Sequence, residues 1–123
     1  AVDTFRPGLE QVALMTLHGA KGLEFRAVFI VGCEEGLLPY SLYKNRVSDP
    51  GEERRLLYVG MTRAKKFLFL SHAEKRYLQG REYKLGRSSF LNRIERELIE
   101  LSEQEHKKKD IKGPVQRTLF DLE

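Results

Sequence analysis

The segment Thr16-Leu-His-Gly-Ala-Lys-Gly-Leu-Glu-Phe25 places side chains that could do chemistry between two apolar runs. It holds a histidine, a lysine and a glutamate, which are His18, Lys21 and Glu24, among two glycines and an alanine. Glycines let the backbone approach a ligand closely, while the lysine and the glutamate supply a cation and a carboxylate. The alternative is a strand-to-turn connection with solvated charges, and the spacing alone does not separate the two.

A second cluster, Glu52-Glu-Arg-Arg-Leu-Leu-Tyr-Val-Gly-Met-Thr-Arg-Ala64, has an arginine near its end. If this segment is a helix, Arg63 projects from the end of a rigid element, where its planar guanidinium can bind a phosphate. The arginine could instead simply satisfy the helix dipole.

The elements that position these clusters follow from apolar runs and capping signals. Continuous apolar runs predict strands over residues 12–17, 27–33 and 67–71, a pattern typical of a parallel sheet covered on both faces. Asp49 followed by Pro50 predicts a helix start, and the helix should run to about residue 64. Strand, connection, strand, helix and strand is the order of an α/β layer fold.

The rest of the chain is predicted to connect and cover this unit. Residues 34–47 should form an exposed, mobile loop, and residues 74–87 a basic connection broken by glycine. Ser88 should cap a long final helix with an amphipathic stripe of Phe90, Leu91, Ile94, Leu98 and Leu101. The expected organisation is an irregular lead over 1–11, a folded segment over 12–101, and a charged helix end with a flexible tail over 102–123.

Length and composition fit a single soluble globular domain. The chain has 123 residues, a net charge of +4 and 41% hydrophobic residues, which is compatible with a polyanionic partner. No apolar run approaches the roughly 20 residues that span a bilayer, so no membrane partner is expected. The single cysteine, Cys33, is typical of a reducing, cytoplasmic location. The chain does not begin with Met, and we expect it to be a piece of a longer protein.

Together the two clusters resemble motifs V and VI of the UvrD/PcrA/Rep family of superfamily 1 DNA helicases. Residues 12–25 are similar to motif V, residues 28–39 to the strand and loop that follow, and residues 52–64 to motif VI. The segment Tyr77 to Ile94 resembles the end of the second RecA-like motor domain. The resemblance covers roughly residues 10–100 and implies a partial RecA-like, P-loop NTPase-type domain. Such a domain has three layers, a mostly parallel sheet and here a long C-terminal helix.

The resemblance also implies roles for individual residues. Arg63 would be the arginine finger that reaches the γ-phosphate of ATP, and Glu24 with Gly22 would lie against the ribose. Thr16 and His18 would contact the DNA backbone, and Lys21 could serve either ligand. Alternatives from the residues alone remain. Thr16 could only end a strand, His18 could be a loop histidine, and Glu24 could pair with Arg26 or cap the following turn.

Two positions near these motifs have structural interpretations. Many members of the family carry serine where this chain has Gly19, which removes one possible phosphate contact. Arg54 and Arg55 are expected to pair with carboxylates and hold the helix that carries Arg63.

The chain has no phosphate-loop motif and no Asp-Glu pair to hold Mg²⁺. ATP and Mg²⁺ would therefore bind in the complete helicase, and this fragment alone should bind no cofactor or metal and be inactive. The implied partners are single-stranded DNA and the first RecA-like domain and inserted domain of the same parent chain. The exposed sheet should favour self-association of the fragment.

The tail carries a separate motif. Gln116, Leu119 and Phe120 form a Gln-x-x-Leu-Phe sequence similar to peptides that dock on the bacterial sliding clamp. The alternative is that the apolar residues fold back onto the core.

The function implied by the resemblance is a part of an ATP-dependent 3′–5′ DNA helicase in repair or replication. Two alternatives are a non-catalytic module that binds DNA or the sliding clamp, and a part of a recombination helicase–nuclease.

Overall fold

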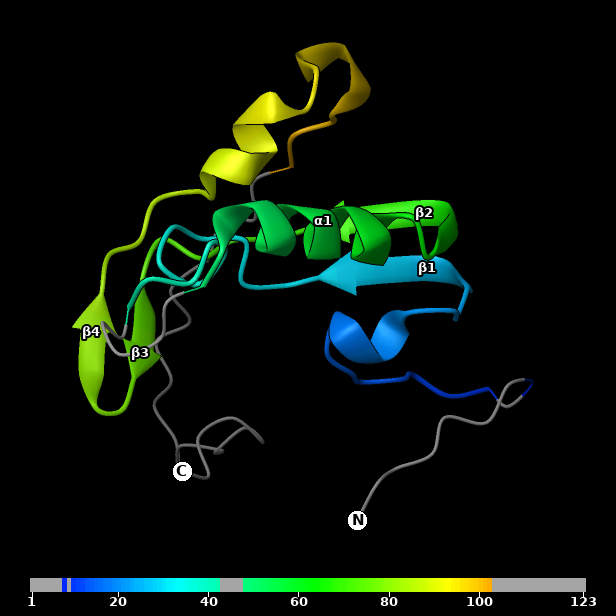
Figure 1. Cartoon of the computed structure of the whole chain (residues 1–123), viewed down its shortest axis with the longest axis horizontal. Coiled ribbons are helices and arrows are strands. Elements are labelled where there is room, and N and C mark those ends of the chain that lie inside the picture. The colour runs from blue at the N-terminus through cyan, green and yellow to red at the C-terminus, as the bar shows by residue number, and fades with distance from the viewer. Residues whose placement is uncertain (1–7, 9, 43–47, 103–123) are drawn as a thin grey trace, which may run out of the picture.

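The centre of the molecule is a parallel pair of strands joined through a helix (Figure 1). The computed structural model describes residues 8, 10–42 and 48–102. Strand β1 spans Phe25–Ile30, helix α1 spans Pro50–Met61 and strand β2 spans Ala64–Leu70. The strands pair in parallel from Phe25 opposite Ala64 to Ile30 opposite Leu70, with a register shift between Phe25 and Ala27. The predicted parallel α/β unit is therefore confirmed.

Helix α1 begins where the sequence predicts it. The Asp49 carboxylate accepts a hydrogen bond of 2.9 Å from the backbone N–H of Gly51, and Pro50 takes the first helical position. The helix ends at Met61, slightly earlier than predicted, because the next two residues turn the chain into β2. Thr62 and Arg63 there donate backbone N–H bonds to the carbonyls of Tyr58 and Gly60.

The predicted strand over residues 12–17 is wrong. Residues 11–16 have no regular structure, and the chain then forms a 3-10 helix, η1, over His18–Ala20. Val12 and Leu14 are 97% and 89% exposed. An apolar run becomes a strand only beside a hydrogen-bonding neighbour, and within the described part of the chain β1 pairs only with β2.

The predicted long C-terminal helix is also wrong. Residues 88–101 contain two short 3-10 helices, η2 over Ser89–Arg93 and η3 over Arg96–Leu98. Ser88 does cap η2, accepting a hydrogen bond from the N–H of Phe90. The stripe packs on the core only through Phe90, Leu91 and Ile94, while Leu98 and Leu101 are exposed. A helix this long is stabilised mainly by packing of its apolar face, and among the described residues the last two positions of that face contact no part of the core.

The connection over residues 74–87 contains a β-hairpin that the sequence interpretation missed. Strand β3, Arg76–Leu78, pairs antiparallel with β4, Arg81–Tyr83. Both residues of the two-residue turn, Gln79 and Gly80, have positive φ, at 50° and 73°. This is the combination that two-residue hairpin turns of type I′ require.

The segment after β1 is part of the core, although the sequence predicted an exposed loop. Cys33, Glu34 and Leu38 are all buried. Ser88 holds this segment, donating its N–H to the Cys33 carbonyl at 2.8 Å and its hydroxyl to the Leu38 carbonyl. Burial raises the pKa of the Cys33 thiol, so Cys33 serves as a packing residue, as predicted. Residues 43–47 lie outside the described residues.

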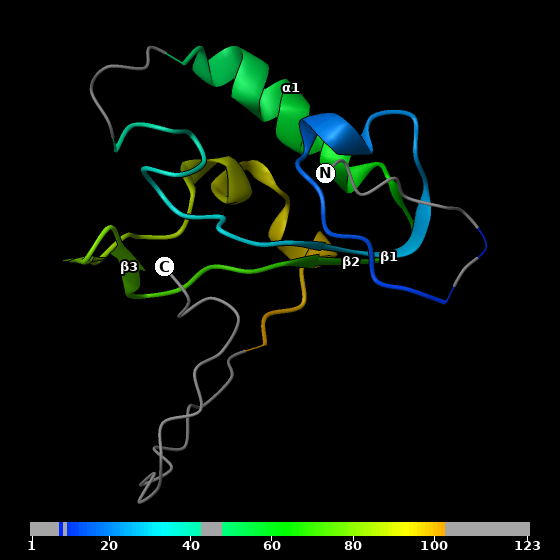
Figure 2. The ribbon, with the colours of Figure 1, turned by 90° about the horizontal axis from the view of Figure 1, so that it is seen from below.

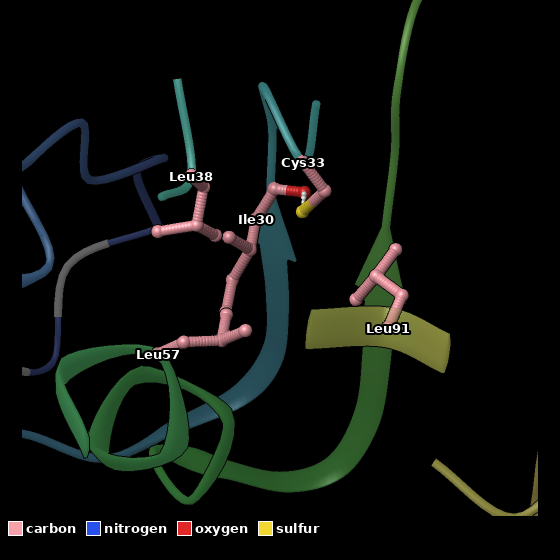
Figure 3. Close-up of a cluster of buried hydrophobic side chains, with 5 residues drawn as sticks. All are labelled: Ile30, Cys33, Leu38, Leu57 and Leu91. Carbon is pink, nitrogen blue, oxygen red and sulfur yellow. Dashed lines mark hydrogen bonds between the residues drawn. The ribbon is translucent and has the colours of Figure 1, made fainter. Parts of the chain in front are cut away.

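The buried core lies on the α1 side of the strands. It consists of five side chains from β1, α1, η2 and the segment after β1, namely Ile30, Cys33, Leu38, Leu57 and Leu91 (Figure 3). Figure 2 shows α1 lying over one side of the strand pair. Alternate residues of the strands point to the opposite face, where Phe29 and Phe69 stack with their ring centroids 4.5 Å apart.

That opposite face is open. Phe29 is 70% exposed, Phe69 48% and Phe67 44%. The described residues therefore form one helical layer and a two-stranded sheet, which is consistent with a partial RecA-like domain. No helix among the described residues is both long and apolar enough to cross a membrane.

Candidate nucleotide and nucleic-acid site

The glycine-rich loop around η1 packs directly against α1. The contact is made by Leu17 and Gly60, because a Cβ atom added to Gly60 would lie 2.5 Å from Cδ2 of Leu17. Gly60 is buried in the helix next to Ile30 of the core. The absence of a side chain at Gly60 thus brings the two sequence clusters into contact.

Arg63 is bound to the loop that carries the predicted nucleotide-binding residues. Its guanidinium donates from Nη1 to the Leu23 carbonyl at 3.3 Å and from Nη2 to the Thr62 hydroxyl at 3.2 Å. Its Nε donates to the Val59 carbonyl at 3.1 Å. The Arg63 carbonyl in turn accepts a bond of 2.9 Å from the N–H of Phe25. Glu24 therefore lies in sequence between two residues that are hydrogen-bonded to Arg63.

Glu24 and Gly22 are accessible beside Arg63. The Glu24 carboxylate lies 3.7 Å from the ammonium of Lys65, and both side chains are more than half exposed. The ion pair is thus with Lys65 rather than with Arg26, the partner that the sequence suggested. Gly22 has a φ of 81°, and a Cβ atom added to it would meet no atom within 4 Å, so its backbone is open to a ligand.

Thr16 has a local structural role in the loop. Its hydroxyl accepts a hydrogen bond of 3.0 Å from the N–H of Gly19, and its carbonyl accepts one from Ala20. A Cβ atom at Gly19 would lie 3.3 Å from the Thr16 hydroxyl oxygen, so glycine suits this turn. Thr16 and His18 are both exposed and remain available to a ligand.

His18 and Lys21 face α1 across a groove with two adjoining hollows. One hollow, of about 490 Å³, lies between His18, the start of α1 and Tyr40. The other, of about 380 Å³, is lined by His18, Lys21 and the α1 residues Glu52, Arg55, Leu56 and Val59, together with Leu17. His18, Glu52 and Leu56 line both hollows, so the two are neighbours along the groove.

Two carboxylates that the sequence interpretation did not single out have structural roles, Glu53 at the groove and Glu34 beside the β3–β4 hairpin. Both oxygens of Glu53 accept from the N–H of Tyr40 at 3.0 Å, and one also accepts from the Ser48 hydroxyl. Glu34 is fully buried and accepts from both Nε and Nη2 of Arg76 and from the N–H of Ala73, each at 2.7 Å. Only tertiary contacts reveal these roles, because glutamates in a loop or a first helical turn are ordinarily solvated.

Arg54 and Arg55 do not behave as predicted. Within the part of the chain that the structure describes, neither arginine forms an ion pair with a carboxylate. Arg55 lines the groove with Lys21, whereas Arg54 lines neither hollow.

The remaining predictions concern a metal site, which was not expected, and the clamp-binding motif of the tail. Among the described residues no group of His, Cys, Asp and Glu side chains could hold a metal ion. Gln116, Leu119 and Phe120 lie outside the described residues.

The site thus belongs to an α/β unit in which an arginine at a helix end contacts a glycine-rich loop next to a parallel strand pair. A family model described as the UvrD-like helicase C-terminal domain matches residues 3–75. The chain belongs to this family, as its motifs suggested.

Individual relatives agree with this assignment. The chain is 48% identical over 99 residues to the ATP-dependent DNA helicase PcrA of Leuconostoc citreum, which covers 80% of this chain and 13% of the relative. It is 42% identical over 118 residues to PcrA of Bacillus subtilis, covering 89% of this chain and 16% of that protein. It is 48% identical over 91 residues to DNA helicase II of Escherichia coli, and the match covers 74% of this chain and 13% of that protein. The chain therefore spans about a seventh of the length of these relatives.

Proposed function

We propose that this chain is the C-terminal part of the second RecA-like motor domain of an ATP-dependent 3′–5′ DNA helicase of the UvrD type. Within that domain Arg63 acts as the arginine finger on the γ-phosphate, Glu24 and Gly22 lie against the ribose, and Thr16 and His18 contact the DNA backbone. The observation that carries the proposal is the contact between the Arg63 side chain and the loop of Gly22 and Glu24.

The geometry around Arg63 suits a phosphate. The three acceptors of its guanidinium are two carbonyls and a hydroxyl, all of them neutral. A hydrogen bond from arginine to a charged phosphate oxygen is shorter and stronger than one to a neutral acceptor. A triphosphate that came within reach could therefore replace these partners.

The chain offers groups for the γ-phosphate and for the ribose of a nucleotide. A guanidinium can stabilise the negative charge of a transferring phosphoryl group, and an exposed carboxylate can accept hydrogen bonds from sugar hydroxyls. Bound Mg²⁺ would neutralise phosphate charge, but the described residues contain no set of carboxylates that could hold it. We assign the metal and most phosphate contacts to the first RecA-like domain of the parent protein.

Replacing Arg63 in the complete parent helicase tests the proposal. Arg63→Ala should lower ATP turnover by about 10³-fold or more, with nucleotide binding retained, because fingers of this kind act on the transition state. Arg63→Lys should recover little of the lost turnover, since a lysine ammonium lacks the planar, two-pronged donor group of the guanidinium. The exposed Arg26 provides a matched control, and Arg26→Ala should keep full turnover. Unchanged turnover in Arg63→Ala would remove the finger assignment.

A further inference from the structure

The groove between η1 and α1 has one wall that suits a sugar–phosphate chain. Glu52, Arg55, Leu56 and Val59 follow one another at helical spacing and so share one face of α1. Leu17, Leu56 and Val59 supply aliphatic surface to the smaller hollow, and Lys21 and Arg55 supply cations. An aliphatic wall can pack against sugars while the cations bind phosphates.

The cations of this hollow are not used by the fold. Lys21 and Arg55 are both exposed, and neither forms an ion pair within the described ranges. Among the residues that line this hollow Glu52 is the one carboxylate, and it is outnumbered by the two cations, Lys21 and Arg55.

The larger hollow has the opposite character. Asp49, Glu52 and Glu53 line it. Asp49 accepts a hydrogen bond from the N–H of Gly51, and Glu53 accepts hydrogen bonds from the N–H of Tyr40 and the hydroxyl of Ser48. Phosphates are therefore favoured only at the end of the groove that holds Lys21 and Arg55.

We propose that Arg55 and Lys21 form a phosphate-binding pair in this groove. The pair binds backbone phosphates of the single-stranded nucleic acid that His18 contacts under the proposed function. The inference rests on the proposed function and extends it to a residue of α1. The phosphates belong to a strand rather than to ATP, because Arg63 lies beyond the end of α1, and Arg55 precedes that end by six residues, roughly 9 Å along the helix axis. The two neighbouring hollows, which share three lining residues, also fit an extended ligand.

The adjacent arginine provides a matched control. Arg54 and Arg55 are neighbours on α1, both exposed, but only Arg55 lines the groove. Changing either arginine to glutamine removes the same charge and keeps a good helix-forming residue. Circular dichroism should confirm that both variants fold like the unchanged chain.

Binding of a fluorescein-labelled oligothymidylate to this chain, followed by anisotropy over a series of salt concentrations, tests the pair. Arg55→Gln and Lys21→Gln should each weaken binding several-fold at low salt. Each should also lower the slope of log K against log salt by about 0.7, the value for one lost phosphate contact on a single strand. Arg54→Gln should leave that slope unchanged.

The outcomes separate this inference from the proposed function. If His18→Ala weakens binding and neither Arg55→Gln nor Lys21→Gln does, the phosphate pair is wrong and the proposed DNA contact stands. If the unchanged chain does not bind the oligonucleotide, both are overturned. ATP and an unlabelled oligonucleotide of equal phosphate content should then be compared as competitors. If ATP displaces the labelled strand equally effectively, the groove binds free nucleotide and the strand assignment is wrong.

Discussion

Glu34 is the residue whose ionisation the structure changes most clearly. Burial opposes its charge, but the two hydrogen bonds from Arg76 and the one from Ala73 outweigh burial and lower the pKa of Glu34. The same contact raises the pKa of Arg76. Glu34 is therefore ionised at neutral pH and joins the segment after β1 to the β3–β4 hairpin.

This shift makes the stability of the fold sensitive to acid. A carboxylate whose pKa is lower in the folded state stabilises the fold above its unfolded-state pKa of about 4.3. That contribution should be lost as the pH falls through the lower folded-state pKa. Urea unfolding between about pH 7 and pH 3 should show a falling midpoint, and Glu34→Gln should flatten that fall. An equally steep fall in Glu34→Gln would exclude Glu34 as its source.

Arg76→Ala at neutral pH should lower the free energy of unfolding by about 3 kcal/mol, because it leaves a buried charge without its cation. We place the loss at the low end of that range since a third of the Arg76 side chain is exposed. Arg81, which is exposed on β4 without an ion pair among the described residues, offers the control Arg81→Ala.

At the scale of elements, the contact between η1 and α1 decides where the functional residues stand. The loop of His18, Lys21 and Glu24 has little regular structure of its own, and Leu17 anchors it against Gly60. Arg63 and Phe25 add a second anchor at the end of the same helix. The helix therefore holds both ends of the loop.

Gly60→Ala tests the first anchor. Alanine should favour the helix by about 1 kcal/mol, but its methyl group would displace Leu17, and overpacking of this kind costs about 1–3 kcal/mol. We expect a net loss of stability in chemical denaturation. In a Leu17→Ala background the clash is absent, so the same glycine-to-alanine change should become stabilising. A loss of equal size in both backgrounds would show that Leu17 is not the obstacle.

At the scale of the whole molecule, the sheet has one covered face and one open face. The α1 side carries the core, whereas the opposite side presents Phe29, Phe67 and Phe69 to solvent. In the proposed parent protein, further elements would cover this face. Alone, the chain exposes contiguous aromatic surface beside unpaired strand edges within the described residues.

The isolated chain should therefore self-associate through this face. Light scattering should give an apparent mass that rises with concentration, and Phe29→Thr/Phe69→Thr should reduce the rise while threonine keeps strand propensity. Leu98 is 76% exposed but lies on η3, away from the strands in sequence, so Leu98→Thr should have little effect. A constant monomer mass for the unchanged chain would contradict the prediction.

The sequence by itself determined the features that depend on neighbouring residues. Asp49 and Pro50 start α1 because capping and a fixed φ act within one turn of the chain. The apolar runs around residues 27–30 and 67–70 mark β1 and β2, and the motifs identified the family. The motifs also assigned Arg63 and Glu24 to the same nucleotide, whereas the hydrogen bond from Arg63 to the loop of Glu24 was seen only in the structure.

The tertiary structure decided what depends on distant partners. The stripe after Ser88 has helical spacing, but within the described part of the chain its last two residues have no core surface to pack on. In the same part of the chain, the run at 12–17 has no neighbouring strand. In the sequence Glu34 has the features of a solvated loop residue, and only the structure shows its hydrogen bonds with Arg76, which is 42 positions away. Arg54 and Arg55 are adjacent and chemically identical, but only Arg55 lies on the side of α1 that lines the groove with η1. Local signals fix the elements, but burial, charge pairing and grooves arise only when those elements pack together.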